Sequence, residues 1–251
     1  MENYSRYSIN DFQQALKDCY LALTFDKFPV EKPKAYILGG QSGAGKSNIH
    51  LMIKQEDSNF ISIDGDTFRS KHPNFEIIQK LYGNEAANYT QSFANNIVMS
   101  LIEQLSSERY NLIIEGTCRR ADVPLKTCTD LKEKGYYAVL AVMCTDKNTS
   151  WQSTIDRYNA MMALGVPPRA VPFGKYQETV NALPNNIEEI YKAGAFDDIL
   201  LLNRNKECLY QFTQSPDINP RGIFESILLG QAVQQSAQDN SETNEDYEME
   251  M

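Results

Sequence analysis

The chain has 251 residues, a formal net charge of −9 and 42% hydrophobic residues, which is enough apolar material for the core of an α/β protein. Six of its 33 acidic residues lie in the last 13 positions with no base among them, and the other 27 nearly balance the 24 basic residues. Because there is also no run rich in lysine and arginine, the composition argues against a nucleic-acid-binding protein.

Targeting signals and covalent cross-links are not evident either. No apolar run approaches the ~20 residues of a membrane span, and Met1–Ser5 lacks the basic and apolar regions of a signal peptide. We therefore expect a cytoplasmic protein. Its five cysteines are odd in number, widely spaced and without a C-x-x-C pair, which favours free thiols, and its two histidines exclude a histidine-rich metal site.

In chain order, the first predicted element is a helix over Ser8–Leu23, capped by Ser8. Short apolar runs then alternate with helical patterns, notably Gln91–Leu105 and Trp151–Ala163. This alternation predicts an α/β fold with a mainly parallel central sheet flanked by helices on both sides. The predicted parallel strands are Ala35–Leu38, Phe60–Ile63, Leu112–Ile114, Tyr137–Met143 and Ile199–Leu202.

The C-terminal part of the chain contains two further predictions. A turn at Asn203–Lys206 precedes the run Cys208–Phe212, which predicts an antiparallel edge strand. We expect one domain over residues 1–238, followed by an acidic tail over residues 239–251 that is too polar to fold.

The most specific motif follows the first predicted strand. Residues 40–47 read G-x-x-x-x-G-K-S, and a helical pattern begins at Asn48, which is the context of a phosphate-binding loop, or P-loop. Lys46 would bridge the β- and γ-phosphates, and the Ser47 hydroxyl would ligate Mg²⁺. The backbone N–H groups of the rest of the loop would cradle the phosphates, and its residues are Gly40, Gln41, Ser42, Gly43, Ala44 and Gly45. The motif predicts a P-loop protein that binds a nucleoside triphosphate.

Two carboxylates follow the second predicted strand, at the end where ligands gather in open α/β sheets. Either Asp64 or Asp66 could accept a proton from a substrate hydroxyl as general base. The alternative for each is an ordinary cap of the next helix. We favour the cap for Asp64 and the base for Asp66.

The third and fourth predicted strands are also followed by polar residues. Glu115 ends an apolar run and resembles a residue that holds water or Mg²⁺, and Thr117 and Arg119 would project into the same cleft. For Arg120 we favour a solvated loop charge. Arg157, on the helical pattern, and Arg169, in a proline-rich loop, would suit a lid that neutralises transition-state charge; spacing alone would leave both on the surface.

Four motifs in this order resemble the zeta toxin family of bacterial toxin–antitoxin systems, from about Ser8 to Tyr210. They are L-G-G-Q-S-G-A-G-K-S, I-D-G-D-T-F-R-S-K-H-P, Y-N-L-I-I-E-G-T and T-I-D-R-Y. The resemblance implies a kinase that transfers the ATP γ-phosphate to the 3′-hydroxyl of UDP-N-acetylglucosamine, with Mg²⁺, and so blocks peptidoglycan synthesis. It also implies a small helical epsilon-type antitoxin that occludes the ATP site.

By the same resemblance, Lys46 and Ser47 hold the nucleotide and Mg²⁺, and Asp66 is the base. The residues that would line the sugar-nucleotide side are Glu115, Thr117, Arg119 and Thr127, and the lid arginines are Arg157 and Arg169.

The chain departs from the family pattern at two places. The lid reads P-R-A-V-P instead of A-R-A-T-P and is one residue shorter, and Met99 stands where a substrate-contacting glutamate is usual. Met99 falls opposite the apolar stripe of its predicted helix, so it indicates either surface drift or an altered sugar site, with Glu103 as a possible replacement carboxylate. Two other functions stay open: a kinase for another UDP-sugar or small molecule, and a nucleotide-binding regulatory protein without turnover.

Overall fold

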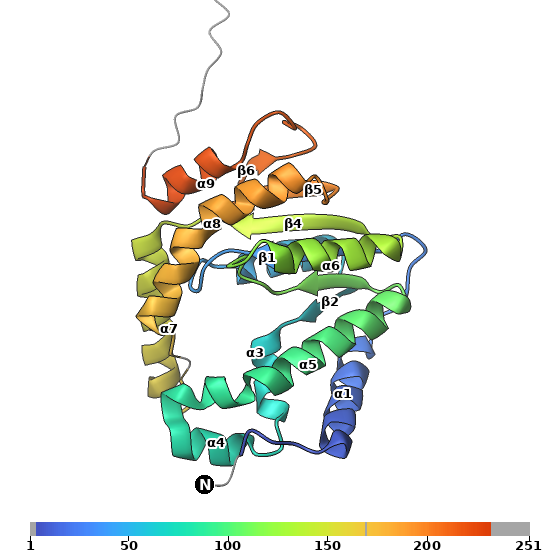
Figure 1. Cartoon of the computed structure of the whole chain (residues 1–251), viewed down its shortest axis with the longest axis vertical. Coiled ribbons are helices and arrows are strands. Elements are labelled where there is room, and N and C mark those ends of the chain that lie inside the picture. The colour runs from blue at the N-terminus through green and yellow to red at the C-terminus, as the bar shows by residue number, and fades with distance from the viewer. Residues whose placement is uncertain (1–3, 169, 232–251) are drawn as a thin grey trace, which may run out of the picture.

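The computed structural model describes residues 4–168 and 170–231, which form a six-stranded sheet with helices on both faces (Figure 1). The strand order is β2-β3-β1-β4-β5-β6; all neighbouring pairs are parallel except β5 and β6, which are antiparallel. The strands are β1 (Lys34–Gly39), β2 (Phe60–Ile63), β3 (Asn111–Ile114), β4 (Tyr137–Met143), β5 (Asp198–Leu202) and β6 (Cys208–Gln211). The predicted α/β class, the parallel sheet and its antiparallel edge are confirmed.

The helices predicted over Ser8–Leu23, Gln91–Leu105 and Trp151–Ala163 and the one after the glycine-rich loop are confirmed, with some ends extended by a turn. The first helix is capped by Ser8, whose hydroxyl accepts from the Asp11 backbone N–H while the Asp11 carboxylate accepts from the Ser8 N–H. The helices are α1 (Ile9–Thr24), α2 (Ser47–Glu56), α3 (Gly65–Phe68), α4 (Phe75–Tyr82), α5 (Ala86–Ser107), α6 (Asp122–Glu133), α7 (Lys147–Ala163), α8 (Phe173–Ala193) and α9 (Arg221–Leu228). Short 3-10 turns lie at Arg69–Lys71 and Gly83–Glu85.

Alternate residues of the central strands pack into two separate cores, one on each face of the sheet. On β1, Ile37 joins the larger core with α1, α5, α6, α8 and α9. Leu38 faces the other way and joins Ile49 and Ile53 of α2 in the smaller core. The loop that follows β1 contributes Ala44 to the smaller core.

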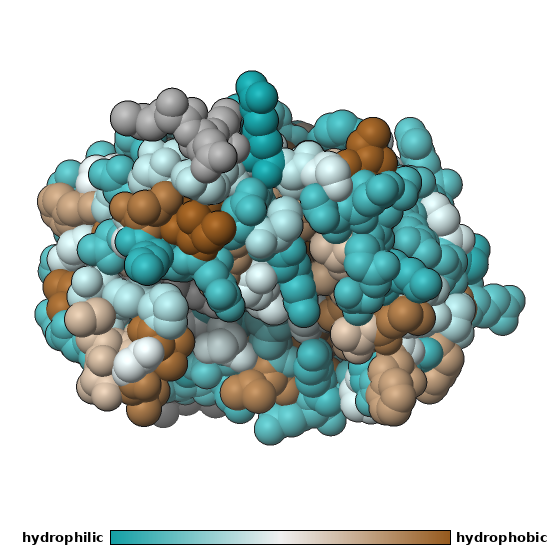
Figure 2. Space-filling model, turned by 90° about the horizontal axis from the view of Figure 1, so that it is seen from below, coloured by the Kyte–Doolittle hydropathy of each residue, from teal (hydrophilic) through white to brown (hydrophobic). Residues whose placement is uncertain are grey.

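The long helix α5 shows how periodicity fixes a face. Its predicted apolar stripe, Phe93, Ile97, Leu101 and Leu105, is fully buried, whereas the Met99 side chain is 55% exposed. The molecular face seen in Figure 2 is largely hydrophilic, with apolar side chains in separate small groups. Within the described residues, no helix is long and apolar enough to cross a membrane.

The domain boundary and the acidic tail stay predictions. The tail over residues 239–251 lies outside the residues that the structure describes, which end at position 231. The lid residue Arg169 also lies outside them, between the described positions 168 and 170.

Candidate functional site

The loop between β1 and α2 has the backbone that the phosphate-binding motif predicts. Gly40 and Gly43 have φ values of 120° and 75°, in the region that favours glycine. Space requires glycine as well, since a Cβ on Gly43 would lie 2.0 Å from the Ser150 carbonyl oxygen, and one on Gly40 would lie 2.9 Å from that of Met143. The loop is therefore packed tightly against β4 and α7.

Buried hydrogen bonds connect this loop to the residues that follow β4 and to α7 and α8. The Gln41 side chain is fully buried, and its amide donates to the Thr145 carbonyl at 2.8 Å and to the Ser150 hydroxyl at 3.0 Å. Thr145 donates to the Ala44 carbonyl at 2.7 Å, and the Tyr176 hydroxyl of α8 lies 2.6 Å from that of Ser150. The network is not complete, because Gln41 Oε1 is buried without a hydrogen-bond partner among the described residues. Its other bonds tie the loop to α7 and α8 and limit its movement, which suits the binding of a ligand by backbone groups.

Lys46 is half-buried at the end of the loop, where its ammonium group donates to the carbonyls of Gly40 at 3.0 Å and Gln41 at 3.4 Å. Burial lowers the pKa of Lys46. The charges of Glu115 and Asp64 oppose this lowering of the pKa, and that of Arg157 adds to it. Charges that follow β2 and β3 and a charge on α7 thus all act on Lys46. The lowered pKa also means that the carboxylates around Lys46 do not fully compensate its burial.

The N-terminus of α2 is suited to phosphate. No side chain caps this helix, and its positive dipole end faces the loop. The N–H groups of Asn48 and Ile49 donate to the Gly45 and Lys46 carbonyls at 2.9 Å. Ser47, the first helical residue, is exposed and available to a cation. Within the described residues no group of three or more histidine, cysteine, aspartate or glutamate side chains could hold a metal. The loop offers the Ser47 hydroxyl as a ligand for Mg²⁺, which protein sites commonly share with substrate phosphates.

The two carboxylates after β2 have different structural environments. Asp64 caps α3, accepting from the Asp66 backbone N–H at 2.9 Å and from the Thr67 hydroxyl at 3.1 Å, so the favoured cap is confirmed. The Asp66 carboxylate is 48% exposed and accepts from Arg69 at 2.9 Å. Arg69 is itself held by the Ala87 carbonyl at 2.7 Å and by Gln91 at 2.6 Å, both on α5. Asp66 is therefore oriented from α5 while it stays accessible.

Glu115, at the end of β3, has a partner that the sequence analysis missed. Its carboxylate lies 2.7 Å from Nε2 of His50, and Nδ1 of His50 lies 3.2 Å from the Ser62 hydroxyl on β2. His50 is three residues after Ser47 on α2, one helical turn further, and this spacing was the only signal for it. The contact fixes the Glu115 carboxylate between α2 and the ends of β2 and β3.

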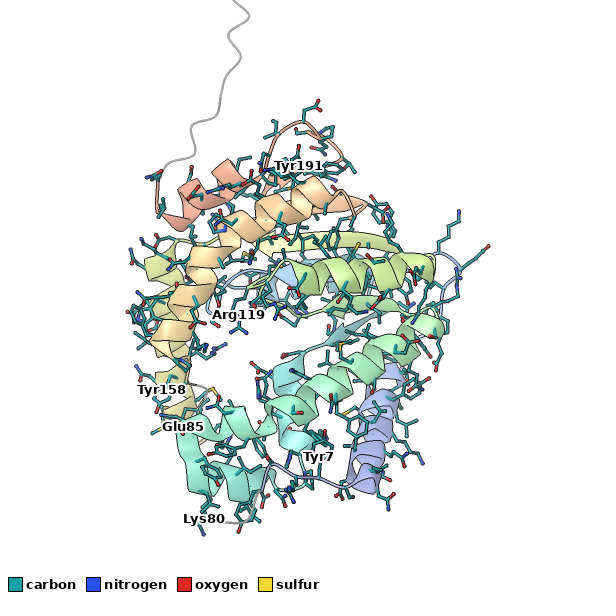
Figure 3. All side chains as sticks on the ribbon, viewed as in Figure 1. Tyr7, Lys80, Glu85, Arg119, Tyr158 and Tyr191 are labelled. Carbon is teal, nitrogen blue, oxygen red and sulfur yellow. The ribbon has the colours of Figure 1, made fainter. Side chains whose placement is uncertain are left out.

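The two arginines in the loop after β3 have different surroundings. Arg120 forms an exposed ion pair with Asp122 at 2.6 Å, which agrees with the predicted solvated loop charge. Arg119 is exposed, and in Figure 3 it lies near the middle of the molecule, below α6. Thr117 is also exposed. The next residue, Cys118, is buried, has a φ of 53° and packs against Gly39. This packing fixes the conformation of the loop.

For the remaining residues considered for the site, the structure gives no hydrogen bond to the phosphate loop among the described residues. Arg157 is exposed on α7, and its charge acts on Lys46. Thr127 is on α6, where its hydroxyl donates to the Val123 carbonyl at 3.0 Å, a bond within the helix. Glu103 pairs with Lys134 at 2.7 Å. Lys134 precedes β4, so Glu103 lies toward the amino edge of the sheet, which argues against the alternative that Glu103 replaces the carboxylate at Met99.

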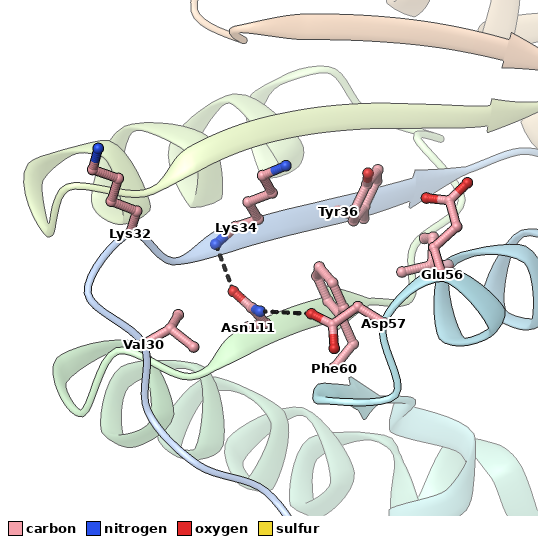
Figure 4. A pocket seen from close by; sticks show the side chains of 9 residues that line it. Val30, Lys32, Lys34, Tyr36, Glu56, Asp57, Phe60 and Asn111 are labelled. Atoms are coloured by element: carbon pink, nitrogen blue, oxygen red, sulfur yellow. Dashed lines mark hydrogen bonds between the residues drawn. The ribbon is translucent and has the colours of Figure 1, made fainter.

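A separate hollow of about 200 Å³ lies near the starts of β1 and β3, away from the loop (Figure 4). Lysines and carboxylates both line it, namely Lys32, Lys34, Glu56 and Asp57. Asn111 crosses its floor, accepting from the Lys34 backbone N–H at 2.8 Å and donating to Asp57 at 3.3 Å. Its charges are of both signs, and it contains none of the predicted site residues.

Known proteins resemble this chain over most of its length. The Zeta toxin family model matches residues 21–215. Toxin zeta of Streptococcus pyogenes is 38% identical over 91% of this chain and 80% of the relative, and Toxin PezT of Streptococcus pneumoniae serotype 4 is 38% identical over 90% and 89%.

Solved structures agree with this assignment. The structure described for the PezAT chromosomal toxin–antitoxin system of Streptococcus pneumoniae matches with a TM-score of 0.83 and 35% identity, over 93% of this chain and 92% of that chain. The AvrRxo1-ORF1:-ORF2 structure with ATP matches with a TM-score of 0.56 at 12% identity, over 89% and 71% of the two chains, which shows a shared fold alone. The chain therefore belongs to the zeta toxin family and has its P-loop kinase-like fold.

Proposed function

We propose that this protein is a toxin kinase that transfers the γ-phosphate of ATP to the 3′-hydroxyl of UDP-N-acetylglucosamine. The observation that carries the proposal is the geometry of the loop, in which glycines with positive φ turn the backbone and Lys46 donates to the Gly40 and Gln41 carbonyls. The lowered pKa of Lys46 agrees with this, because the negative charge of phosphates would stabilise the ammonium form.

The residues divide into a donor side and an acceptor side. On the donor side, the backbone from Gly40 to Ser47 would hold the phosphates, and Lys46 would contact the β- and γ-phosphates. Ser47 would hold Mg²⁺, which when bound neutralises phosphate charge. Arg157 and Arg169 would stabilise charge that develops on the transferred group.

On the acceptor side, Asp66 would accept the proton of the attacking hydroxyl while Arg69 keeps its carboxylate oriented. Glu115, Thr117, Arg119 and Thr127 would contact the sugar nucleotide. His50 would orient Glu115 for this role, and the exposure of Thr117 and Arg119 supports contact with a ligand.

A second candidate is a kinase for a different UDP-sugar, and Met99 favours it. Methionine is a poor acceptor for a sugar hydroxyl, and Glu103 does not replace the missing carboxylate because it pairs with Lys134. A nucleotide-binding regulator without turnover is less well supported, since Asp66, Glu115 and Arg157 are all present.

A product assay tests both candidates. The protein is incubated with Mg-ATP and a panel of UDP-sugars, and phosphorylated products are identified by mass spectrometry, with Asp66→Asn as the inactive control. We expect a 3′-phosphorylated UDP-sugar. ATP hydrolysis or binding without any phosphorylated sugar nucleotide would contradict the proposed acceptor.

We also propose a helical epsilon-type antitoxin as partner, because the S. pneumoniae structure that this chain resembles belongs to a toxin–antitoxin system. Such a partner would cover the region of Gly40–Ser47 and compete with ATP. Calorimetry that gives the same antitoxin affinity with and without saturating ATP would refute the competition.

A further inference from the structure

The turn between β5 and β6 lies against the phosphate loop, although the two are far apart in the sequence. Arg204, half-buried in this turn, donates from Nε to the Ala44 carbonyl at 3.1 Å, 160 residues away, and from its terminal nitrogen to the Gly43 carbonyl. The side-chain carbons of Arg204 also cover Gly45, where an added Cβ would lie 3.5 Å from Arg204 Cγ. One guanidinium group thus holds two consecutive carbonyls of the loop.

The planar trans peptide bond gives these contacts a consequence for the other side of the loop. In each peptide unit the C=O and the following N–H point in opposite directions. When Arg204, together with the Thr145 hydroxyl, holds the Ala44 carbonyl, the Gly45 N–H is directed to the opposite side. A cation on the carbonyl side also polarises the peptide unit and strengthens its N–H as a donor. Arg204 therefore acts on the face of the loop that would meet phosphate.

The same guanidinium also contacts the helix that carries a lid arginine. Its terminal nitrogen donates to the Ser153 hydroxyl on α7 at 2.8 Å. Ser153 and Arg157 are four residues apart on α7, so they lie on one face, one turn apart. The Arg204 backbone carbonyl in turn accepts from Asn48 of α2 at 3.0 Å. Arg204 thus joins the phosphate loop, α2 and the part of α7 next to Arg157.

We propose that Arg204 is a positioning residue for nucleotide binding, which sets the phosphate loop from its carbonyl side and fixes the register of α7 against it. The inference rests on the proposed use of ATP but not on the identity of the acceptor. The fork of donors on a guanidinium is what meets three separate oxygens, so a lysine with the same charge cannot replace it fully.

The test measures ATP binding directly, without any acceptor. Calorimetry with Mg²⁺ and a non-hydrolysable ATP analogue compares the wild type with Arg204→Met, Arg204→Lys and Lys206→Met. Lys206 is the matched control, since it is an exposed cation on the same turn. We expect Kd to rise about tenfold or more in Arg204→Met, since charge-assisted hydrogen bonds are lost, and to recover only partly in Arg204→Lys. Lys206→Met should stay within about twofold, as expected for an exposed charge.

Other readouts separate this role from a loss of folding and from the acceptor question. Melting temperatures identify any variant that does not fold. If Arg204→Met is one of these, Arg204→Lys carries the test and should bind the analogue more weakly than Lys206→Met. Equal affinity in all variants, or full recovery by lysine, would overturn the inference. A wild type that binds ATP yet phosphorylates no UDP-sugar would remove the proposed acceptor and leave the role of Arg204 standing.

Discussion

The two edges of the sheet use polar residues in opposite ways. At the amino edge, groups are satisfied by near neighbours: Asn111 links Lys34 and Asp57, and the Tyr136 hydroxyl donates to the Tyr110 carbonyl at 2.6 Å. At the carboxyl edge, Lys46 is held by loop carbonyls while charges from three elements surround it. The carboxylates at the carboxyl edge are also paired, Glu115 with His50 and Asp66 with Arg69. The difference between the edges therefore lies at Lys46, whose charge contacts carbonyl oxygens rather than a carboxylate, which favours the binding of an added anion.

The largest effect is expected when Lys46, the cation at the carboxyl edge, is removed. Lys46→Ala should abolish phosphoryl transfer, because no other group would reach the transferred phosphate in the same way. The melting temperature should change little, since Lys46 bonds only to loop carbonyls. A folded Lys46→Ala protein that still transfers phosphate would contradict the site. Transfer is followed with labelled ATP, and folding by circular dichroism.

Asp64 and Asp66, the two carboxylates after β2, allow a structural role and a catalytic role to be compared within one turn. Asp66→Asn should lower kcat by about 10²–10⁴-fold, as for loss of a general base, while ATP still binds. Asp64→Asn should retain much of its cap, because asparagine also caps helices well, and should stay within about 1 kcal/mol of the wild-type free energy of unfolding. Kinetics and denaturant titration of both variants check this, and a dead Asp64→Asn beside an active Asp66→Asn would reverse the two roles.

His50 tests whether the carboxyl edge depends on orientation as well as charge. His50→Leu removes the partner of Glu115 and should lower kcat/KM for the acceptor by about 10–100-fold, since a hydrogen bond to a charged group contributes about 1.5–3 kcal/mol. The matched variant Ser62→Ala removes only the contact at Nδ1 and should have the smaller effect. Unchanged kinetics in His50→Leu would mean that Glu115 needs no positioning.

Met99 sharpens the comparison along α5, which runs between the two edges. Met99→Glu restores the carboxylate of the family pattern and should improve kcat/KM for UDP-N-acetylglucosamine by about tenfold. Glu103→Gln should leave kcat/KM unchanged, because Glu103 pairs with Lys134 toward the amino edge. If Met99→Glu has no effect on any UDP-sugar tested, this face of α5 does not contact the substrate, and surface drift explains Met99.

The smallest effect is expected at Glu188, whose two ion pairs contribute to stability and lie outside the proposed site. Lys192 and Arg221 lower the pKa of Glu188 from 4.5 to about 2, joining α8 to α9. A depressed carboxyl pKa stabilises the fold above pH 4.5, and this stabilisation is lost as pH falls toward 2. Glu188→Gln should therefore melt lower than the wild type at pH 7, and the difference should narrow between pH 4.5 and 2. A difference that does not depend on pH would contradict the ion pair.

Local sequence patterns are sufficient to predict most strands of this protein, several of its helices and the nature of its loop. Strands such as Phe60–Ile63 and Tyr137–Met143 are predictable to the residue, because a short apolar run between turns has few other local solutions. The phosphate loop is predictable for the same reason, since closely spaced glycines with positive φ are a local property of the backbone. Several motifs in order are then enough to indicate the family that the comparisons confirm.

The partners of the site residues become evident only in the tertiary structure. His50 meets Glu115 across 65 residues, and Arg204 meets the phosphate loop across 160, so no local pattern could have paired them. The same holds for Glu103, whose helical spacing placed it beside Met99 but whose partner Lys134 comes from the end of another helix. Periodicity fixes which face of an element a side chain occupies, whereas the packing of distant elements fixes what that face meets.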